Sequence, residues 1–363
     1  MKKSLIALAV LAAAGVASAQ VTITGNYTAG YKSSSQAPRT GGLVQQGAQA
    51  VTQALAGGSN GNADGDSSGF GIDTSLITFT AKEDLGAGMS VAAEMSIDGL
   101  NRAGVSGGDS SLKLTTGVGR ITLQTYKPVD YLSGGVSGVG GVGMDNKVFP
   151  ARGLKDAVGF DTKVGPVFLG IAHMEQASAS GGSTSGVGMG LGAGGAGAAG
   201  TTGQRLNSLS VTYMGGGLVA NANYLVYDGR TDNVNTSYKD VLRAAASYDF
   251  GVAKVGGGMS VLTTTSGATL TDGLLAVSVP VGGALTLGAN VATETMTGTI
   301  TQTYTGVGTL PAGALDQTRS GYGLSATYAL SKRTSLIANY ANWLSAIGKD
   351  RSSETNLLVS HSF

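Results

Sequence analysis

The chain has 363 residues, with 23 basic and 22 acidic side chains and no cysteine. The near balance of charge argues against a surface built to bind nucleic acid or another polyanion, and the lack of cysteine excludes disulfides and a thiol nucleophile. Hydrophobic residues make up 42% of the chain and recur with a period of two, so the composition also argues against a disordered protein.

Residues 1–19 have the order of a secretory signal peptide. The basic pair Lys2-Lys3 is followed by an apolar stretch from Leu5 to about Val16 and then by three small residues. This stretch is shorter than the roughly 20 residues that a membrane-spanning helix needs. We therefore expect cleavage just before Gln20 instead of a retained anchor, and a mature chain that forms a single domain over residues 20–363.

From Gln20 onward, short segments alternate apolar and polar residues, as half-buried β-strands do. In the first segment Val21 and Ile23 alternate with Thr22 and Thr24. The same alternation predicts strands at residues 75–82, 89–98, 110–117, 120–126, 156–163, 166–175, 206–214, 218–227, 240–250, 253–262, 273–280, 284–294, 321–330, 334–343 and 353–363.

The connections between these strands alternate between short and long. Short turns are predicted at residues 83–88, 117–119, 164–166, 215–217, 250–252, 281–283 and 330–333. Long connections, rich in Gly, Ser, Thr and Asn, are predicted near 33–72, 99–109, 127–155, 176–205, 228–239, 263–272, 295–320 and 344–352. Outer-membrane barrels have this organisation, whereas a soluble sandwich or β-helix gives no reason for it. We therefore predict an all-β fold, a sixteen-stranded antiparallel transmembrane β-barrel.

The phase of the strands predicts which charged residues face the barrel interior. Lys113 lies between Leu112 and Leu114, and a lysine at mid-bilayer on the lipid face costs about 2–4 kcal/mol. Lys113 is therefore expected to face inward, and phase gives the same direction for Arg120 and Arg243.

Aromatic residues are predicted to gather near the two ends of the strands. Tyr213 and Tyr248 lie near short turns, whereas Tyr227 and Tyr340 lie near long connections. Two aromatic girdles at the membrane interfaces would give this pattern, and isolated core or surface tyrosines are the alternative.

Four short motifs occur in order along the chain: Glu83-Asp84-Leu85-Gly86, the stretch from Ser247 to Lys254, the stretch from Tyr328 to Thr334, and the ending His361-Ser362-Phe363. On these motifs the sequence from Gln20 to Phe363 resembles the trimeric general porins of Gram-negative bacteria, particularly the betaproteobacterial type. The resemblance implies a water-filled channel in the outer membrane for passive diffusion of small hydrophilic solutes and ions.

The resemblance also implies an inward-folded third loop, which corresponds here to residues 127–155. Its charged residues Asp130, Asp145, Lys147 and Arg152 are candidates for the constriction, and ordinary solvated loop charges are the alternative. The glycine run 134–143 suggests a mobile gate.

The chain departs from its relatives at positions that usually carry wall arginines, which are Leu76, Thr80, Thr125 and Gly159 here. Lys113, Arg120 and Arg243 are the candidates to replace part of that positive charge. Because the usual wall arginines are absent, we do not expect this chain to share the anion preference of some relatives.

Partners follow from the resemblance alone. It implies a homotrimer, contact with outer-membrane lipids, and recognition of the last strand, ending in Phe363, by the barrel-assembly machinery. A simple terminal strand is the other interpretation of Phe363.

No residue set for catalysis or for a cofactor is found. The chain has only His173 and His361, no metal-ligand spacing, and glycine runs without the strand and helix of a nucleotide site. The sequence therefore predicts no enzyme activity, cofactor or metal. A substrate-selective barrel, or an adhesive or receptor barrel without a general open pore, is the alternative function.

Overall fold

The computed structural model describes residues 20–36, 65–101, 104–150, 152, 155–176, 205–227, 238–265, 267–298, 303–304, 308–309, 317–344 and 351–363. Within these ranges there is no helix with the length and apolarity needed to cross a membrane.

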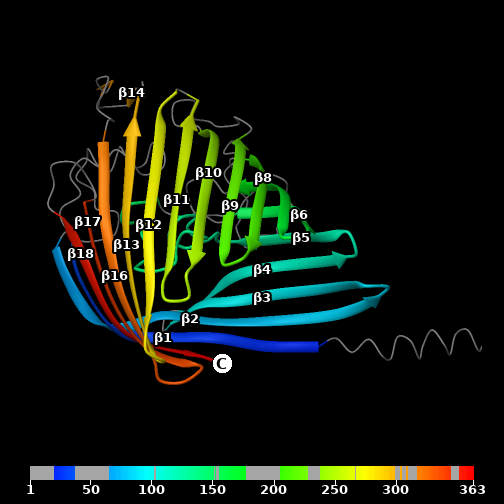
Figure 1. Cartoon of the computed structure of the whole chain (residues 1–363), viewed down its shortest axis with the longest axis horizontal. Helices are drawn as coiled ribbons and strands as arrows, with labels where there is room; N and C mark the ends of the chain where they lie inside the picture. The colour runs from blue at the N-terminus through cyan, green and yellow to red at the C-terminus, as the bar shows by residue number, and fades with distance from the viewer. Residues whose placement is uncertain are drawn as a thin grey trace, which may run out of the picture.

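Sixteen of the described strands close an antiparallel barrel in which each strand pairs with its neighbours along the chain (Figure 1). The first eight are β1 (Gln20–Gln36), β2 (Gly65–Gly86), β3 (Met89–Asn101), β4 (Gly104–Thr116), β5 (Gly119–Tyr126), β6 (Lys155–Val164), β7 (Val167–Gln176) and β8 (Arg205–Gly215). The others are β9 (Leu218–Tyr227), β10 (Tyr238–Asp249), β11 (Lys254–Thr264), β12 (Thr269–Val281), β13 (Leu285–Thr297), β16 (Gln317–Ala329), β17 (Thr334–Leu344) and β18 (Ser352–Ser362). The predicted sixteen-stranded antiparallel barrel is confirmed.

Some strands extend further than the alternation predicts. β2 begins at Gly65 instead of Ser75, and its added residues pair with the second half of β1. β3 ends at Asn101 and β4 begins at Gly104, so most of the long connection predicted at 99–109 is strand. These extensions are rich in glycine and serine, which give no apolar alternation to detect. A two-stranded sheet of β14 (Thr303–Tyr304) and β15 (Gly308–Thr309) lies between β13 and β16 and was not predicted.

The barrel closes where the first strand meets the last. The Gly25 amide donates to the Phe363 carbonyl at 3.0 Å, and the Phe363 amide donates to the Gly25 carbonyl at 3.1 Å. The Phe363 ring lies over Gly25, where a Cβ atom would be 2.3 Å from the ring. Glycine is therefore required at position 25 for the C-terminal aromatic ring to lie across the closing pair of strands.

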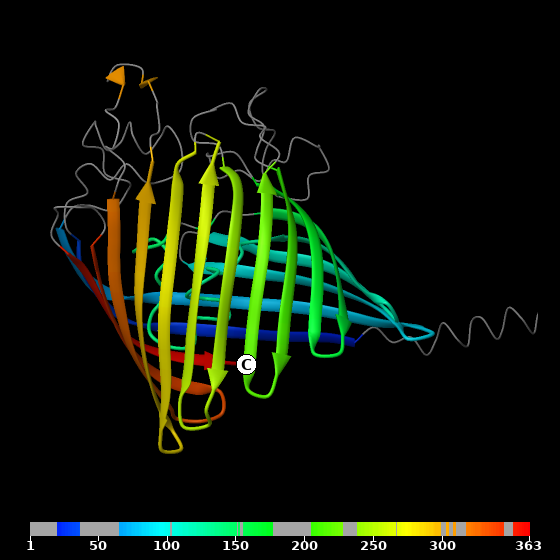
Figure 2. The same cartoon turned by 45° about the horizontal axis from the view of Figure 1, so that its top comes forward.

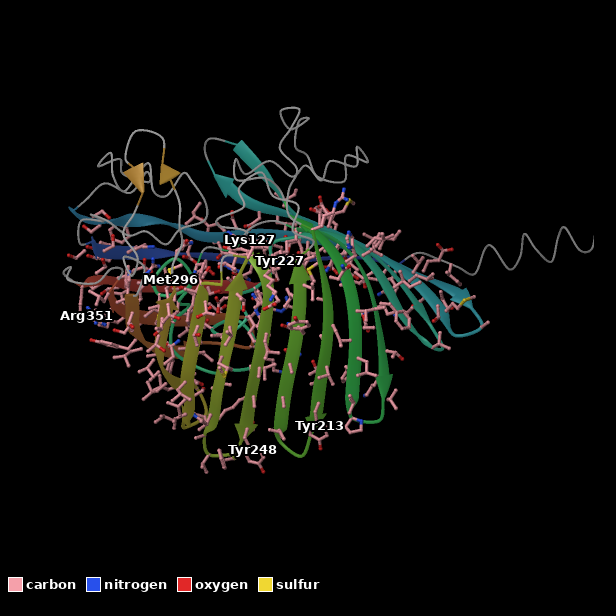
Figure 3. The ribbon with its side chains drawn as sticks, turned by 90° about the horizontal axis from the view of Figure 1, so that it is seen from above. Lys127, Tyr213, Tyr227, Tyr248, Met296 and Arg351 are labelled. Carbon is pink, nitrogen blue, oxygen red and sulfur yellow. The ribbon has the colours of Figure 1, made fainter. Side chains whose placement is uncertain are left out.

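The two faces of the wall differ as a transmembrane barrel requires. On β12, Leu274 is 3% exposed and its neighbour Leu275 is 64% exposed. Leu275 belongs to an outward row of apolar residues that includes Val291 and Leu324, which would contact lipid. Figure 3 shows Tyr213 and Tyr248 at the end of the barrel with short turns, and Tyr227 toward the opposite end. Tyr213 and Tyr248 agree with the predicted girdle at the short-turn end. Tyr227 does not belong to a girdle, because it packs against the buried, inward-facing residues Leu206, Leu225 and Val241.

Candidate functional site

The segment after β5 leaves the wall and folds into the barrel. We call the described residues 127–150 and 152 the inner loop; part of it is seen behind β12 and β13 in Figure 2. It has no regular strand or helix, apart from a bridge between Asp145 and Phe149. Its path is therefore determined by its contacts with the wall.

Apolar side chains attach the inner loop to one side of the wall. Four of its apolar residues are almost fully buried: Leu132, Met144, Val148 and Phe149. They pack with inward-facing wall residues of β12, β13 and β17, which are Leu274, Ala276, Ala292, Ala341 and Trp343. Burying each large side chain contributes about 1.5–3 kcal/mol, so this cluster holds the inner loop against the wall.

The wall beneath the inner loop lacks side chains at several positions. We define the loop seat as the inward-facing glycines Gly256 and Gly258 of β11, Gly288 of β13, and Gly321 and Gly323 of β16. A Cβ atom at Gly256 would be 2.3 Å from the Ser137 carbonyl oxygen, and one at Gly288 would be 2.6 Å from the Gly141 amide nitrogen. Glycine therefore allows loop and wall backbones to meet directly.

Glycines of the inner loop make the same kind of contact from the other side. A Cβ atom at Gly140 would be 2.1 Å from the Val277 carbonyl oxygen. Beside it, the Asn290 amide donates a hydrogen bond to the Val142 carbonyl at 2.7 Å. These contacts hold the inner loop against the wall, and they argue against the mobile gate that the glycine run alone suggested.

We expect Gly256→Ala to displace the inner loop, because its methyl group would collide with a backbone atom of Ser137 that side-chain rotation cannot move. Overpacking of this kind costs about 1–3 kcal/mol. Limited trypsin digestion of the folded protein should then cleave after Lys147, where we expect protection in the unmodified chain because the Lys147 side chain is only 16% exposed. Gly257→Ala is the matched control, since its neighbour is the flexible end of the Leu275 side chain. Equal protection in both variants would contradict the loop-seat role.

Three of the four predicted loop charges have partners in or beside the inner loop. The Asp130 carboxylate accepts hydrogen bonds from the amide and hydroxyl of Ser133. Arg152 Nε lies 2.8 Å from Asp145 Oδ2, so these two predicted residues come together as an ion pair. They hold the two ends of the inner loop near each other, since Arg152 also donates to the Pro128 carbonyl.

The fourth loop charge, Lys147, connects the inner loop to β18 and β17. Its ammonium lies 3.5 Å from Glu354 Oε1 and 5.6 Å from the centre of the Trp343 ring. Glu354 also forms an ion pair with Lys32 of β1, in which Lys32 Nζ lies 2.8 Å from Glu354 Oε2. A single carboxylate thus lies between two ammonium groups.

Arg243 of β10 stacks on the inner loop. Its guanidinium carbon is 5.0 Å from the centre of the Tyr131 ring, and the Tyr131 hydroxyl donates to Asn221 Oδ1 at 2.9 Å. Burial raises the pKa of the Tyr131 phenol, although the Arg243 cation acts in the opposite direction. The phenol therefore stays a neutral donor, and Arg243 is brought beside the loop residues around Asp130.

Lys113 and Arg120 lie on a different part of the wall. β5 is eight strands from β13 around the barrel, which places it opposite the loop seat. Lys113 Nζ pairs with Glu94 Oε2 at 3.0 Å, and Arg120 Nε pairs with Asp161 Oδ1 at 2.9 Å. The seven predicted charged residues thus form two groups, one on or against the inner loop and one across from it.

A buried charged cluster on the inner wall was not predicted. Asp272, Glu294 and Arg319 are cross-strand neighbours on β12, β13 and β16, and Arg319 Nε lies 3.4 Å from Glu294 Oε1. Each has the inward phase, which the alternation could have revealed. Their adjacency depends on strand register, which the alternation of single strands does not determine. The partners Glu94, Asp161 and Glu354 were missed for the same reason.

The histidines do not form a reactive site. His173 Nδ1 lies 2.9 Å from Asn207 Oδ1 on the neighbouring strand, and His361 lies beside Thr334 near the end of the chain. In the part of the chain that the structure describes, no group of three or more His, Asp or Glu residues is arranged to hold a metal ion.

A closed barrel of sixteen strands with an apolar exterior, a charged interior and a loop folded along its inner wall defines a channel-forming barrel of the porin class. The sequence model of the Gram-negative porin family matches residues 5–343. The chain therefore belongs to the Gram-negative porin family, and it is an outer-membrane channel protein.

Solved structures show the same fold at low sequence identity. The anion-selective porin from Comamonas acidovorans is 18% identical, with a TM-score of 0.61 over 95% of this chain and 100% of that one. A loop L8 deletion mutant of OmpT from Vibrio cholerae is 11% identical, with a TM-score of 0.58 over 95% and 99%. A mutant of the Rh. blastica porin is 12% identical, with a TM-score of 0.56 over 95% and 100%. No curated protein sequence matches this chain.

Proposed function

We propose that the channel is water-filled and passes small hydrophilic solutes and ions by passive diffusion, without chemistry on the solute. The observation that carries this proposal is the separation of the two faces of the wall. Outward positions are apolar and exposed, whereas charged residues such as Lys113, Arg120 and Arg243 have the inward phase. Barrels of this strand number leave an aqueous lumen, so such a wall supports diffusion through its interior.

We further propose that the narrowest section lies between the inner loop and the wall of β4 and β5. On the loop side the charges are Asp130, Asp145, Lys147 and Arg152, together with Arg243; Lys113 and Arg120 are across from them. Most of these charges are paired with an opposite charge. Paired charges cancel at distances beyond the pair, so the channel is expected to discriminate weakly between anions and cations.

Planar lipid bilayers test both proposals. The purified protein should give stepwise conductance proportional to salt concentration, with a reversal potential close to zero across a potassium chloride gradient. Folded protein that gives no steps would contradict the open channel.

Single neutralisations should then reveal the paired charges. Glu94→Gln leaves Lys113 unpaired and should shift the reversal potential toward anion preference, whereas Lys113→Gln should shift it toward cation preference. Glu83→Gln, beside the first short turn, is the control of equal charge change and should shift it little. A wild-type channel with strong selectivity would show that the ion pairs do not cancel in the lumen.

The expectations for biogenesis stay proposals. We propose that residues 1–19 are cleaved as a signal peptide, that residues 20–363 form one barrel domain, and that the mature chain assembles as a homotrimer. Phe363 is the proposed assembly signal, and its place on the closing pair of strands supports a role at the end of folding. N-terminal sequencing of the mature protein and its mass in detergent test the first and third of these proposals.

A further inference from the structure

A single row of inward-facing polar side chains crosses five neighbouring strands of the wall. Strand register places one residue of each strand directly beside the next, in the order Arg243 of β10, Ser260 of β11, Asp272 of β12, Glu294 of β13 and Arg319 of β16. The two carboxyl groups are therefore direct cross-strand neighbours, and an arginine stands at each end of the row.

Only one of the two carboxyl groups is joined to an arginine of the row. Arg319 Nε lies 3.4 Å from Glu294 Oε1. At the other end Arg243 Nε donates to the Ser260 hydroxyl at 3.4 Å, so Ser260 separates this guanidinium from Asp272. Asp272 thus lies beside Glu294 without an ion-pair cation of its own among the described residues.

Apolar side chains surround the two carboxyl groups on the inner face of the wall. On β12, Asp272 lies between Leu270 and Leu274, which are 6% and 3% exposed. On β13, Glu294 is 2% exposed and follows the equally buried Ala292 on the same face. Two ionised carboxylates side by side are strongly disfavoured in such surroundings, because burial weakens their contact with water and strengthens their mutual repulsion.

The contact between the two carboxyl groups requires a hydrogen atom. The groups lie within hydrogen-bonding reach of each other. Asp272 Oδ1 and Glu294 Oε2 are buried oxygens that receive no hydrogen bond from a donor in the described part of the chain. Ionised carboxylates only accept hydrogen bonds, whereas a protonated carboxyl group donates one. A single proton therefore turns a repulsive contact into a hydrogen bond.

The described groups that face this carboxyl pair favour the same state. Besides the two arginines of the row, they are the Tyr238 phenol of β10 and Asp130 of the inner loop, which is close enough to Asp272 to act on its charge. With both carboxyl groups of the pair ionised, three carboxylates would face two guanidinium groups. With one proton bound, the negative and positive charges among these groups are equal in number.

We propose that Asp272 and Glu294 form a proton-binding site that holds one proton at neutral pH and releases it to the lumen at alkaline pH. Release places a second negative charge near Asp130, so the start of the inner loop responds to the pH of the lumen. The site goes beyond the proposed diffusion channel, and it rests on an open pore only for its effect on ion preference.

Infrared spectra of the folded protein in detergent test for the proton directly. At pH 7 the wild type should show the carbonyl band of a protonated carboxyl group. Asp272→Asn should lose this band, because the asparagine amide donates to Glu294 in place of the proton. Asp161→Asn is the matched control and should keep the band, since Asp161 is 37% exposed and pairs with Arg120. A wild type without the band, or a band undiminished in Asp272→Asn, would overturn the proposal.

Urea unfolding detects the same proton through stability. Above about pH 5 the carboxyl groups of the unfolded chain are ionised, so a proton bound only by the folded state raises the unfolding equilibrium constant about tenfold per pH unit. This rise should be present in the wild type and in Asp161→Asn, and it should be missing from Asp272→Asn. Equal pH dependence in all three proteins would also overturn the proposal.

Asp130→Asn tests the connection to the inner loop, and it keeps the proposal testable if Asp272→Asn does not fold. Removing a neighbouring negative charge makes release of the proton easier, so the carboxyl band should disappear at a lower pH than in the wild type. An unchanged pH would contradict the response of the loop.

Planar bilayers separate the proton site from the open channel. Alkaline pH should shift the reversal potential toward cation preference further in the wild type than in Asp272→Asn, because only the wild type gains a negative charge at the pair. Equal shifts would contradict the effect on ion preference. Folded protein that shows the carboxyl band but no conductance steps would support the proton site and contradict the open channel.

Discussion

Deleting residues 131–149 of the inner loop and joining the ends with a short glycine-serine linker should raise the single-channel conductance severalfold. The loop lies inside the lumen along β11 to β17, and the resistance of a pore is greatest at its narrowest section. The deletion should also admit larger uncharged polymers in liposome-swelling assays. The free energy of unfolding should fall, since the buried contacts of Met144 and Phe149 are lost.

An equally long deletion, residues 180–198, is the control. That stretch lies outside the described residues, and its glycine-rich sequence predicts a long external connection. Its removal should leave the conductance nearly unchanged. If the folded 131–149 deletion conducted like the unmodified protein, the narrowest section would have to lie elsewhere.

Arg319→Met should be the most destabilising single substitution on the inner wall. Glu294 is 2% exposed, its carboxylate pairs with Arg319, and Asp272 is its neighbour on the other side. Without Arg319, the buried Glu294 would lose its ion-pair cation and would keep a second carboxylate, that of Asp272, beside it. Breaking a buried pair in this way costs about 3–5 kcal/mol. Urea unfolding of the detergent-folded protein, followed by Trp343 fluorescence and by mobility on unheated gels, measures the loss.

Arg120→Met is the matched control, because Arg120 and Asp161 are 48% and 37% exposed. An exposed pair contributes about 0–1 kcal/mol, so this variant should unfold close to the wild type. The double variant Glu294→Gln/Arg319→Met should recover part of the stability by removing one of the two carboxylates. Equal losses in the two single variants would show that burial does not govern the Glu294 pair.

The sequence was sufficient to predict the barrel because the alternation of apolar and polar residues within each strand shows which side chains face inward and which face outward. Lys113 between two leucines identifies the inner and outer faces without reference to any other strand. The same method failed at the start of β2, where glycine and serine fit either face equally well. Strand existence was therefore predicted, whereas strand length was predicted only where apolar residues alternate.

The interior was harder to predict because its contacts join residues that are far apart in sequence. Lys32 meets Glu354 only because β1 and β18 close the barrel in one register. The glycines at 134–143 suggested mobility, although the same residues also permit close approach, and the difference depends on the facing glycines of the loop seat. Composition does not distinguish these two uses of glycine.

The pairing of Gly25 with Phe363 means that the barrel can close only when both ends of the chain are present. The two strands that close it come from opposite ends of the chain, so a chain truncated at its C-terminus keeps the exposed edges of an open sheet. Contacts between such distant residues form late in folding, because a long loop must be closed first. An unfinished chain is therefore expected to stay recognisable to proteases and chaperones by its unpaired edges until its last residue is in place.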